Sequence, residues 1–444
     1  MKLNNKRTIL VGLAFLSICA FWQMYDSVIP LILTKTFKIN ETISGAVMAA
    51  DNVLALFLLP LFGTLSDRTD TRIGKRTPYI LFGTFAAVVL MNILPFLDNG
   101  YYEAPSMAKL VIFVVLLGLI LISMGTYRSP AVALMPDVTP KPLRSKANAI
   151  INLMGALGGI LYLGVAAILY PNSKIAGLSH VNYRPLFIVV SAIMAVSVIV
   201  MYATIREKEL VRENQELEAA HPEWNLTEHD MSGHEVLPHD VKKSLGFLLA
   251  SIALWFIGYN GITTWFTTYV DRVMGQGLGG ASTCLLIASA GAIVSYIPIG
   301  AIASKIGRKR TILIGIIILA ACFLAGFFLT TLSKSLNIAM FAIFAVTGFA
   351  WAAINVNSLP MVVEMCKGSD IGKFTGYYYT ASMAAQVATP ILAGFLMRNV
   401  DYRILFPYAT IFVAASFVTM TRVRHGDAAV EARKGLDAFE DIDV

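Results

Sequence analysis

The sequence carries little charge for its length. Only 14% of its 444 residues are Asp, Glu, Lys or Arg, whereas 57% are hydrophobic. Soluble domains usually have about 45–50% apolar and about 25% charged residues. Apolar stretches of roughly twenty residues recur along the whole chain, which indicates a membrane protein with many helical spans rather than a soluble domain with one anchor.

Cysteine and catalytic motifs are scarce as well. Neither a disulfide framework nor a zinc site is expected, because no two of the four cysteines form a CxxC pair. They are Cys19, Cys284, Cys322 and Cys366. The stretch IGKRT (73–77) is no Walker A motif, because Arg76 stands where Ser or Thr is required. With no catalytic triad or nucleotide loop either, we expect no enzymatic activity and no cofactor.

Most of the histidines lie in one polar segment. Their spacing matches no metal-ligand pattern, so we interpret them as solvated side chains and expect no metal site. They are His221, His229, His234 and His239.

Hydropathy predicts an all-α membrane protein with twelve transmembrane helices. The spans lie near 8–33, 42–66, 78–97, 108–135, 147–170, 185–205, 244–268, 281–304, 311–331, 338–362, 371–397 and 402–422. The first span follows basic residues as a secretory signal does, but it is too long for such a signal and leads into no cleavage pattern. We therefore expect it to remain as a helix.

Lysine and arginine are distributed unevenly between the spans. With a cytoplasmic N-terminus, 25 of the 35 Lys and Arg lie in cytoplasmic segments and 9 in outer ones, and Arg128 lies inside a span. Cytoplasmic loops carry such an excess. This explains the net charge of +7 without a nucleic-acid partner. We expect both termini in the cytoplasm and the protein in the plasma membrane.

Two charged loops at matching positions indicate an internal duplication. GTLSDRTDTRIGKR (63–76) follows the second span, and GAIASKIGRKR (300–310) follows the eighth. Asp137 and Glu364 likewise end the fourth and tenth spans. Such parallel repeats build transporters around a central axis.

The duplication predicts two pseudo-symmetric six-helix bundles, at 1–205 and 244–424. A polar cytoplasmic linker at 206–243 joins them, and its first dozen residues predict an interfacial helix. A cytoplasmic tail follows at 425–444.

The first charged loop resembles the signature loop of the major facilitator superfamily, G-xxx-D-R-xxx-G-[RK]-[RK]. The matching residues are Gly63, Asp67, Arg68, Gly74, Lys75 and Arg76. The extended loop, SDRTDTRIGKRTPYI, is similar to that of sucrose/proton symporters and of glycoside-pentoside-hexuronide cation symporters. PDVTPKPLRSKANAI (136–150) and GFAWAAINVNSLPMVVE (348–364) resemble the sucrose type. The resemblance implies a monomeric sugar transporter with the major facilitator fold.

Two departures from these families matter. Ser304 stands in the second loop where the first has Asp67, so only the first loop carries that carboxylate. The stretch LALFLLPLFG (54–63) lacks the acids of a melibiose-type sodium site. A proton is therefore favoured over sodium as the coupling ion.

The resemblance also implies a cytoplasmic lock between the two halves. In the superfamily the loop carboxylate and arginines make this lock, although charges at this place can also serve only to set topology. The candidate lock residues are Gly63, Asp67, Arg68, Arg72, Gly74, Arg76, Asp137, Arg144 and Glu364.

Few ionisable groups lie inside the spans, and each costs about 2.5–3.5 kcal/mol at a helix centre. Asp26 and Asp51 lie roughly 10 and 14 Å below the outer ends of their spans, so we expect them at a similar depth. A low-dielectric site favours the protonated form of an acid, as a reversible proton carrier requires. We expect Asp26, Asp51 or both to couple proton movement. Arg128 lies nearer the cytoplasmic side, and we expect it either to join them or to pair with Asp137 or with loop groups.

Polar and aromatic side chains four residues apart share a helix face, as Trp22 and Asp26 do. Aromatic rings stack on the apolar faces of sugars while amides and acids bond the hydroxyls, although helix packing explains any single ring equally well. The candidate substrate-binding residues are Trp22, Gln23, Tyr25, Asp26, Arg128, Trp255, Tyr259, Asn260, Trp351, Asn355, Asn357 and Gln386.

Three functions fit these features. The first is a proton-coupled sugar symporter that works by alternating access. The second is a proton-coupled drug or metabolite antiporter of the same superfamily, which composition does not separate from the first. The third is a membrane protein that transports nothing, such as a sensor.

Overall fold

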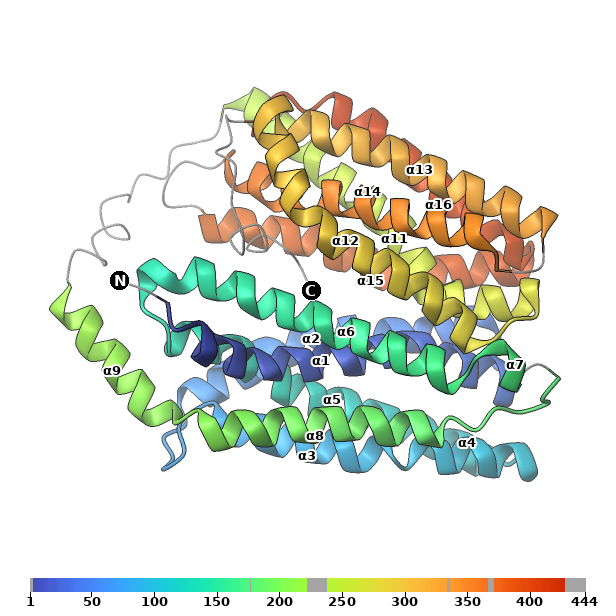
Figure 1. Cartoon of the computed structure of the whole chain (residues 1–444), viewed down its shortest axis with the longest axis horizontal. Coiled ribbons are helices and arrows are strands. Elements are labelled where there is room, and N and C mark those ends of the chain that lie inside the picture. Colours follow the sequence, from blue (N-terminus) through green and yellow to red (C-terminus); the bar gives the residue numbers. More distant parts are fainter. Residues whose placement is uncertain (1–2, 176, 222–237, 334–335, 366–370, 428–444) are drawn as a thin grey trace. The chain divides into compact units, whose positions relative to one another are not determined.

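The computed structural model describes residues 3–175, 177–221, 238–333, 336–365 and 371–427. Within them, twelve helical segments are long and apolar enough to cross a membrane, and each matches one predicted span to within a few residues. The all-α membrane architecture is therefore confirmed (Figure 1). The long helices are α1 (Asn5–Leu31), α2 (Glu41–Asp67), α3 (Thr77–Met91), α4 (Leu94–Glu103), α5 (Met107–Asp137), α6 (Arg144–Leu169), α8 (Arg184–Thr204), α9 (Glu207–Ala220), α11 (His239–Met274), α12 (Leu278–Ile306), α13 (Arg308–Leu332), α14 (Ile338–Val363), α15 (Ile371–Asn399) and α16 (Leu405–Thr421).

The chain divides into two compact units. The first contains residues 1–40 and 50–225, and the second contains 41–49 and 226–443. The first unit therefore includes α9, the helix that begins the linker.

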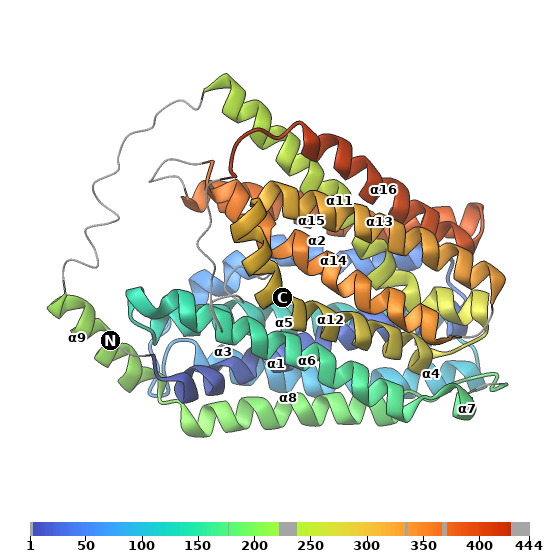
Figure 2. The same cartoon turned by 45° about the horizontal axis from the view of Figure 1, so that its top comes forward.

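Four helix pairs of the first unit recur in the second. In the first unit, α1 packs on α6 and α8, and α3 packs on α5 and α8. In the second unit, α11 packs on α15 and α16, and α13 packs on α14 and α16 (Figure 2). Counted as spans, these are identical pairs, so the duplication seen in the loops extends to the packing.

Glycines allow the closest helix crossings within each unit. A Cβ on Gly158 of α6 would lie 2.0 Å from the Leu16 carbonyl oxygen of α1. A Cβ on Gly348 of α14 would lie 2.0 Å from the Ala288 carbonyl oxygen of α12. Only glycine fits at such distances, which is the reason small residues recur where membrane helices cross.

Candidate functional site

Asp26, Asp51 and Arg128, which lie inside membrane spans, belong to one electrostatic group in the first unit. The carboxyls of Asp26 and Asp51 lie close enough to interact, and the Arg128 guanidinium interacts with Asp51. Arg128 also lies over the ring of Trp22, with its Cζ 5.9 Å from the ring centroid. The Asn52 side-chain amide donates a 2.8 Å hydrogen bond to Asp51. Arg128 thus lies beside Asp51, whereas the Asp137 carboxylate pairs with Lys75 and Arg76.

The two acids and their polar neighbours are partly exposed. Trp22, Gln23, Asp26, Asp51 and Arg128 are all half-buried. The indole N–H of Trp22 is buried without a hydrogen-bond partner among the described residues. An unpaired buried donor costs about 1–3 kcal/mol, so this N–H is available to an acceptor on a ligand.

An aromatic stack dominates the corresponding region of the second unit. The rings of Tyr259 (α11) and Trp351 (α14) lie parallel, with centroids 3.7 Å apart and an interplanar angle of 3°. The ring of Phe256 meets Trp351 edge-on at 5.3 Å. Nearby in the sequence of the same two helices, the Asn260 amide nitrogen and the Asn355 amide oxygen are buried and lack partners among the described residues.

The four remaining predicted binding residues differ in burial and neighbours. Tyr25 and Trp255 are buried, with exposed fractions of 1% and 0%. Tyr25 lies beside the acids, because it interacts electrostatically with Asp26 and Asp51 and its ring meets that of Trp22 edge-on at 5.5 Å. Asn357 is also buried and donates to the Ala353 carbonyl of its own helix at 2.9 Å. Gln386 on α15 is half-buried. The role of these four in substrate binding stays a prediction.

Sequence reasoning missed Tyr296 on α12. This buried tyrosine interacts electrostatically with Tyr259 of the aromatic stack. Several of the other candidates were found as polar or aromatic residues four positions apart, which share a helix face. Tyr296 has no such neighbour, so the sequence did not indicate it as a binding residue.

The loop after α2 is organised around Arg76, which is 5% exposed. Its guanidinium forms ion pairs with Asp67 and with Asp137, the latter at 2.9 Å, and donates to the Ser66 hydroxyl at 2.5 Å. Lys75 adds a 3.1 Å ion pair to Asp137. We call Asp67, Lys75, Arg76 and Asp137 the Arg76 cluster.

Glu207, the first residue of α9, binds the backbone of this loop. Its carboxylate accepts hydrogen bonds from the backbone N–H groups of Lys75, Arg76 and Thr77 at 2.7–2.8 Å, and from the Thr77 hydroxyl at 2.7 Å. The Thr77 N–H opens α3 and the other two directly precede it. N–H groups at the start of a helix have no helical partner, and a negative charge is favoured there. Gly74 is required beside it, because its φ is +118° and a Cβ there would lie 2.3 Å from the Glu207 carboxylate.

The rest of α9 is tied to the same unit. Glu218 pairs with Arg144 at 2.9 Å, and Lys208 pairs with Asp70 at 3.0 Å. The Asn214 amide donates to the Asp137 carbonyl at 3.1 Å. The predicted linker helix is therefore present, and these contacts hold it against the loop and the ends of α5 and α6.

The second unit repeats this design with different residues. Arg308 at the start of α13 forms an ion pair with Glu364 after α14, as Arg76 does with Asp137. Gly307 has a φ of +90°, and Asp427 accepts a 3.2 Å hydrogen bond from the Lys309 backbone N–H. Asp427 follows the twelfth span as Glu207 follows the sixth.

The candidate lock residues thus fall into three groups. Asp67, Gly74, Arg76 and Asp137 meet in or beside the Arg76 cluster, with Gly63 contributing a carbonyl 3.4 Å from Arg76, and Arg144 holds α9. Glu364 pairs within the second unit. Arg68 and Arg72 are exposed and form no ion pair with any described residue. A lock between the halves stays a prediction.

Metal-binding residues do not gather in the described ranges: no three His, Cys, Asp or Glu side chains there form a group that could hold an ion. His229, His234 and Cys366 lie outside those ranges.

The chain belongs to the Major Facilitator Superfamily, whose family pattern it matches over residues 11–336 and 277–438. It is a transporter and not an enzyme. The Arabidopsis thaliana sucrose transport protein SUC3 is 27% identical over 145 residues, which are 30% of this chain and 24% of that protein. The chain thus matches about a quarter of the length of this relative.

Solved transporter structures share the whole fold at low sequence identity. The nucleoside transporter NupG superposes with a TM-score of 0.67 and 14% identity, covering 94% of this chain and all of NupG. The xylose transporter XylE from E. coli gives a TM-score of 0.67 and 15% identity, covering 95% of this chain and 96% of XylE. These likenesses define the fold.

Proposed function

We propose that this transporter carries a sugar, a glycoside or disaccharide, together with protons by alternating access. The observation that carries the proposal is the group formed by Asp26, Asp51 and Arg128 on a half-buried face of the first unit. The two carboxyls interact electrostatically, so the protonation of one depends on the charge of the other and on the nearby guanidinium. Such a group binds or releases a proton when its surroundings change.

The aromatic and amide groups support a sugar as the substrate. The Tyr259–Trp351 stack offers a flat apolar face, and the unpaired polar atoms of Trp22, Asn260 and Asn355 offer one acceptor and two donors. Sugars present apolar ring faces and many hydroxyls, which is the complementary chemistry. The partial match to a sucrose transport protein agrees with this assignment.

The charged loops support a two-state mechanism. The Arg76 cluster and the Arg308–Glu364 pair each join helix ends within one unit. Arg68 and Arg72 are exposed and pair with no described carboxylate, and the side chain of Asp67 is 59% exposed although it pairs with Arg76, so all three can contact a further partner. We assign them to a cytoplasmic lock, which would bias the state that forms it by about 1–3 kcal/mol.

Uptake by the purified full-length protein in sealed proteoliposomes tests the function. A panel of labelled mono- and disaccharides is offered with an inward proton gradient, an inward sodium gradient or neither. We expect one class of saccharide to accumulate only with the proton gradient. Accumulation driven equally by sodium would contradict proton coupling.

A drug or metabolite antiporter is the second candidate. The same acids and aromatic rings suit a hydrophobic cation, because a cation is attracted to ring faces and carboxylates. Movement of hydrophobic cations against the proton gradient, with no movement of any saccharide, would favour this candidate.

A further inference from the structure

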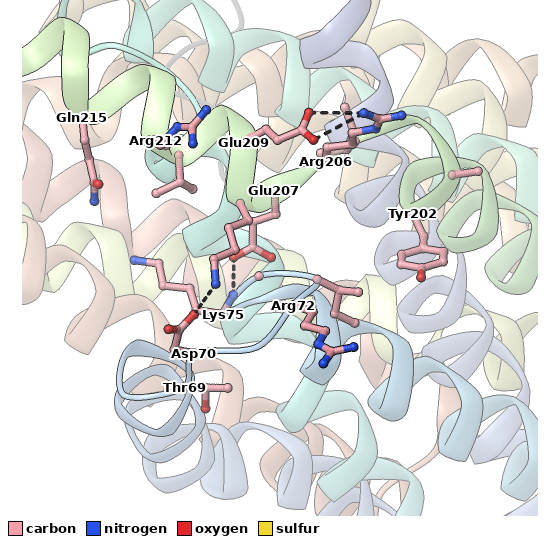
Figure 3. A pocket seen from close by; sticks show the side chains of 16 residues that line it. Thr69, Asp70, Arg72, Lys75, Tyr202, Arg206, Glu207, Glu209, Arg212 and Gln215 are labelled. Atoms are coloured by element: carbon pink, nitrogen blue, oxygen red, sulfur yellow. Dashed lines mark hydrogen bonds and ion pairs between the residues drawn. The ribbon is translucent and has the colours of Figure 1, made fainter.

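A basic groove curves around the junction of α8 and α9 in the first unit. A cavity of about 950 Å³ lies between this junction and the loop after α2 (Figure 3). A second cavity of about 300 Å³ reaches from the junction to the start of α1. Ile205, Arg206 and Glu209 line both cavities, so the two adjoin, and we call them together the basic groove.

Positive charge dominates the groove. Seven cations line it against three acids. Each acid is already engaged: Glu207 with the loop backbone, Asp70 with Lys208, and Glu209 with Arg206. The cations are Lys6, Arg7, Arg72, Lys75, Arg206, Lys208 and Arg212.

Three of these cations have no carboxylate of their own. Lys6, Arg7 and Arg72 form no ion pair with any described residue, and Arg7 lines the smaller cavity while Arg72 lines the larger one. Figure 3 shows the Arg72 side chain between the loop and Tyr202, without an interaction to the other residues drawn. A guanidinium in this position offers a planar set of donors that suits a phosphate group.

The groove is apolar at its membrane end. Leu10, Tyr202 and Ala203 line it and belong to the first and sixth membrane spans. Tyr202 is 44% exposed. The groove thus begins beside membrane-spanning residues and ends among the charges of α9, so its occupant needs both an apolar and an anionic part.

We propose that the basic groove binds the phosphate-bearing headgroup of an anionic glycerophospholipid. The distribution of Lys and Arg assigns this face to the cytoplasm, whose leaflet carries the negative surface potential that attracts such basic pockets. A soluble phosphate shares the headgroup chemistry but leaves the apolar end uncovered. A bound headgroup would bridge the loop after α2 and α9, adding to the link that Glu207 makes.

Lipid titration of the full-length protein tests this binding. Purified protein in detergent is titrated with phosphatidylglycerol or with phosphatidylcholine of the same acyl chains, and bound lipids are counted by native mass spectrometry. We expect selective retention of phosphatidylglycerol. In the variant Arg7→Ala/Arg72→Ala, affinity should fall by about fivefold for each arginine removed.

Two further variants distinguish an effect of positive charge in the groove from an effect of positive charge elsewhere on the protein. Arg7→Lys/Arg72→Lys keeps the charge and should retain most of the binding. Lys305→Ala/Arg310→Ala removes two exposed charges beside spans of the second unit and should leave the affinity unchanged. Thermal melting confirms that each variant is folded.

Several results would overturn the proposal. Equal binding of the two lipids would contradict selectivity for the headgroup. An equal loss of affinity in the Lys305→Ala/Arg310→Ala variant would contradict the placement of the site in the basic groove. Displacement of phosphatidylglycerol by glycerol phosphate at comparable concentration would identify a soluble phosphate compound as the ligand.

Discussion

The carboxylate of Glu207 binds both the backbone N–H and the hydroxyl of Thr77, at 2.8 and 2.7 Å, although 130 residues separate the two in the chain. Thr77 is the first residue of α3, and Glu207 is the first residue of α9. The linker helix therefore caps a transmembrane helix. The charged loop between α2 and α3 is held from both sides, by the Arg76 cluster and by this cap.

Removing the cap should destabilise the first unit. In Glu207→Ala, three backbone N–H groups and one hydroxyl lose a charged partner. A hydrogen bond to a charged group contributes about 1.5–3 kcal/mol to stability, and water replaces part of this loss. We expect a lower Tm in detergent for Glu207→Ala and a smaller decrease for Glu207→Gln. The control is Glu216→Ala, since Glu216 lies on the same helix with a side chain 71% exposed. Equal Tm values for Glu207→Ala and this control would show that the cap contributes nothing.

Gly74 should tolerate no side chain. Both Gly74 and Gly177 have positive φ, at +118° and +82°, but only Gly74 faces a neighbour, the Glu207 carboxylate. Gly177→Ala therefore meets only the backbone penalty of about 1–2 kcal/mol. Gly74→Ala must also displace Glu207. We expect the larger loss of Tm at Gly74, and a loss of the same size at both positions would contradict the close contact.

A buried ion pair and an exposed one should contribute differently to the free energy of unfolding. The Arg308 and Glu364 side chains are 10% and 25% exposed, whereas those of Lys208 and Asp70 are 59% and 86% exposed. Glu364→Gln leaves a covered guanidinium without its carboxylate, which costs about 3 kcal/mol. Asp70→Asn should cost less than about 1 kcal/mol. Chemical or thermal unfolding in detergent compares the two, and a larger effect at Asp70 would reverse this order.

The aromatic stack should determine the apparent affinity for substrate. Tyr259→Ala removes one of the two stacked rings, and we expect KM for the transported saccharide to rise about tenfold, as for the loss of roughly 1.4 kcal/mol of binding. Tyr259→Phe keeps the ring and should stay close to the unmodified protein. If Tyr259→Ala leaves KM unchanged while transport continues, the stack does not contact the substrate.

The sequence was sufficient for features that depend on composition and order along the chain. The twelve spans follow from hydropathy, because a helix in lipid must be apolar over the membrane thickness. The grouping of Asp67, Arg76 and Asp137 follows from their place at helix ends on one side of the membrane. Both predictions use information carried by each segment alone.

Contacts with backbone groups were beyond sequence reasoning. Glu207 binds N–H groups, which every residue except proline carries, so nothing in the loop sequence identifies its partner. The same holds for Asp427 and the start of α13. The direction of Arg128 was also unpredictable, because the helical position alone allows the long side chain to reach either towards Asp51 or towards Asp137.

Proton movement coupled to sugar entry tests the central claim most directly. A pH-sensitive dye sealed inside proteoliposomes reports internal acidification when the transported saccharide is added outside without an imposed gradient. We predict acidification with the unmodified protein and none with Asp26→Asn/Asp51→Asn, although that variant still exchanges labelled for unlabelled sugar. Undiminished sugar-driven acidification in the Asp26→Asn/Asp51→Asn variant would contradict the assignment of proton coupling to these two acids.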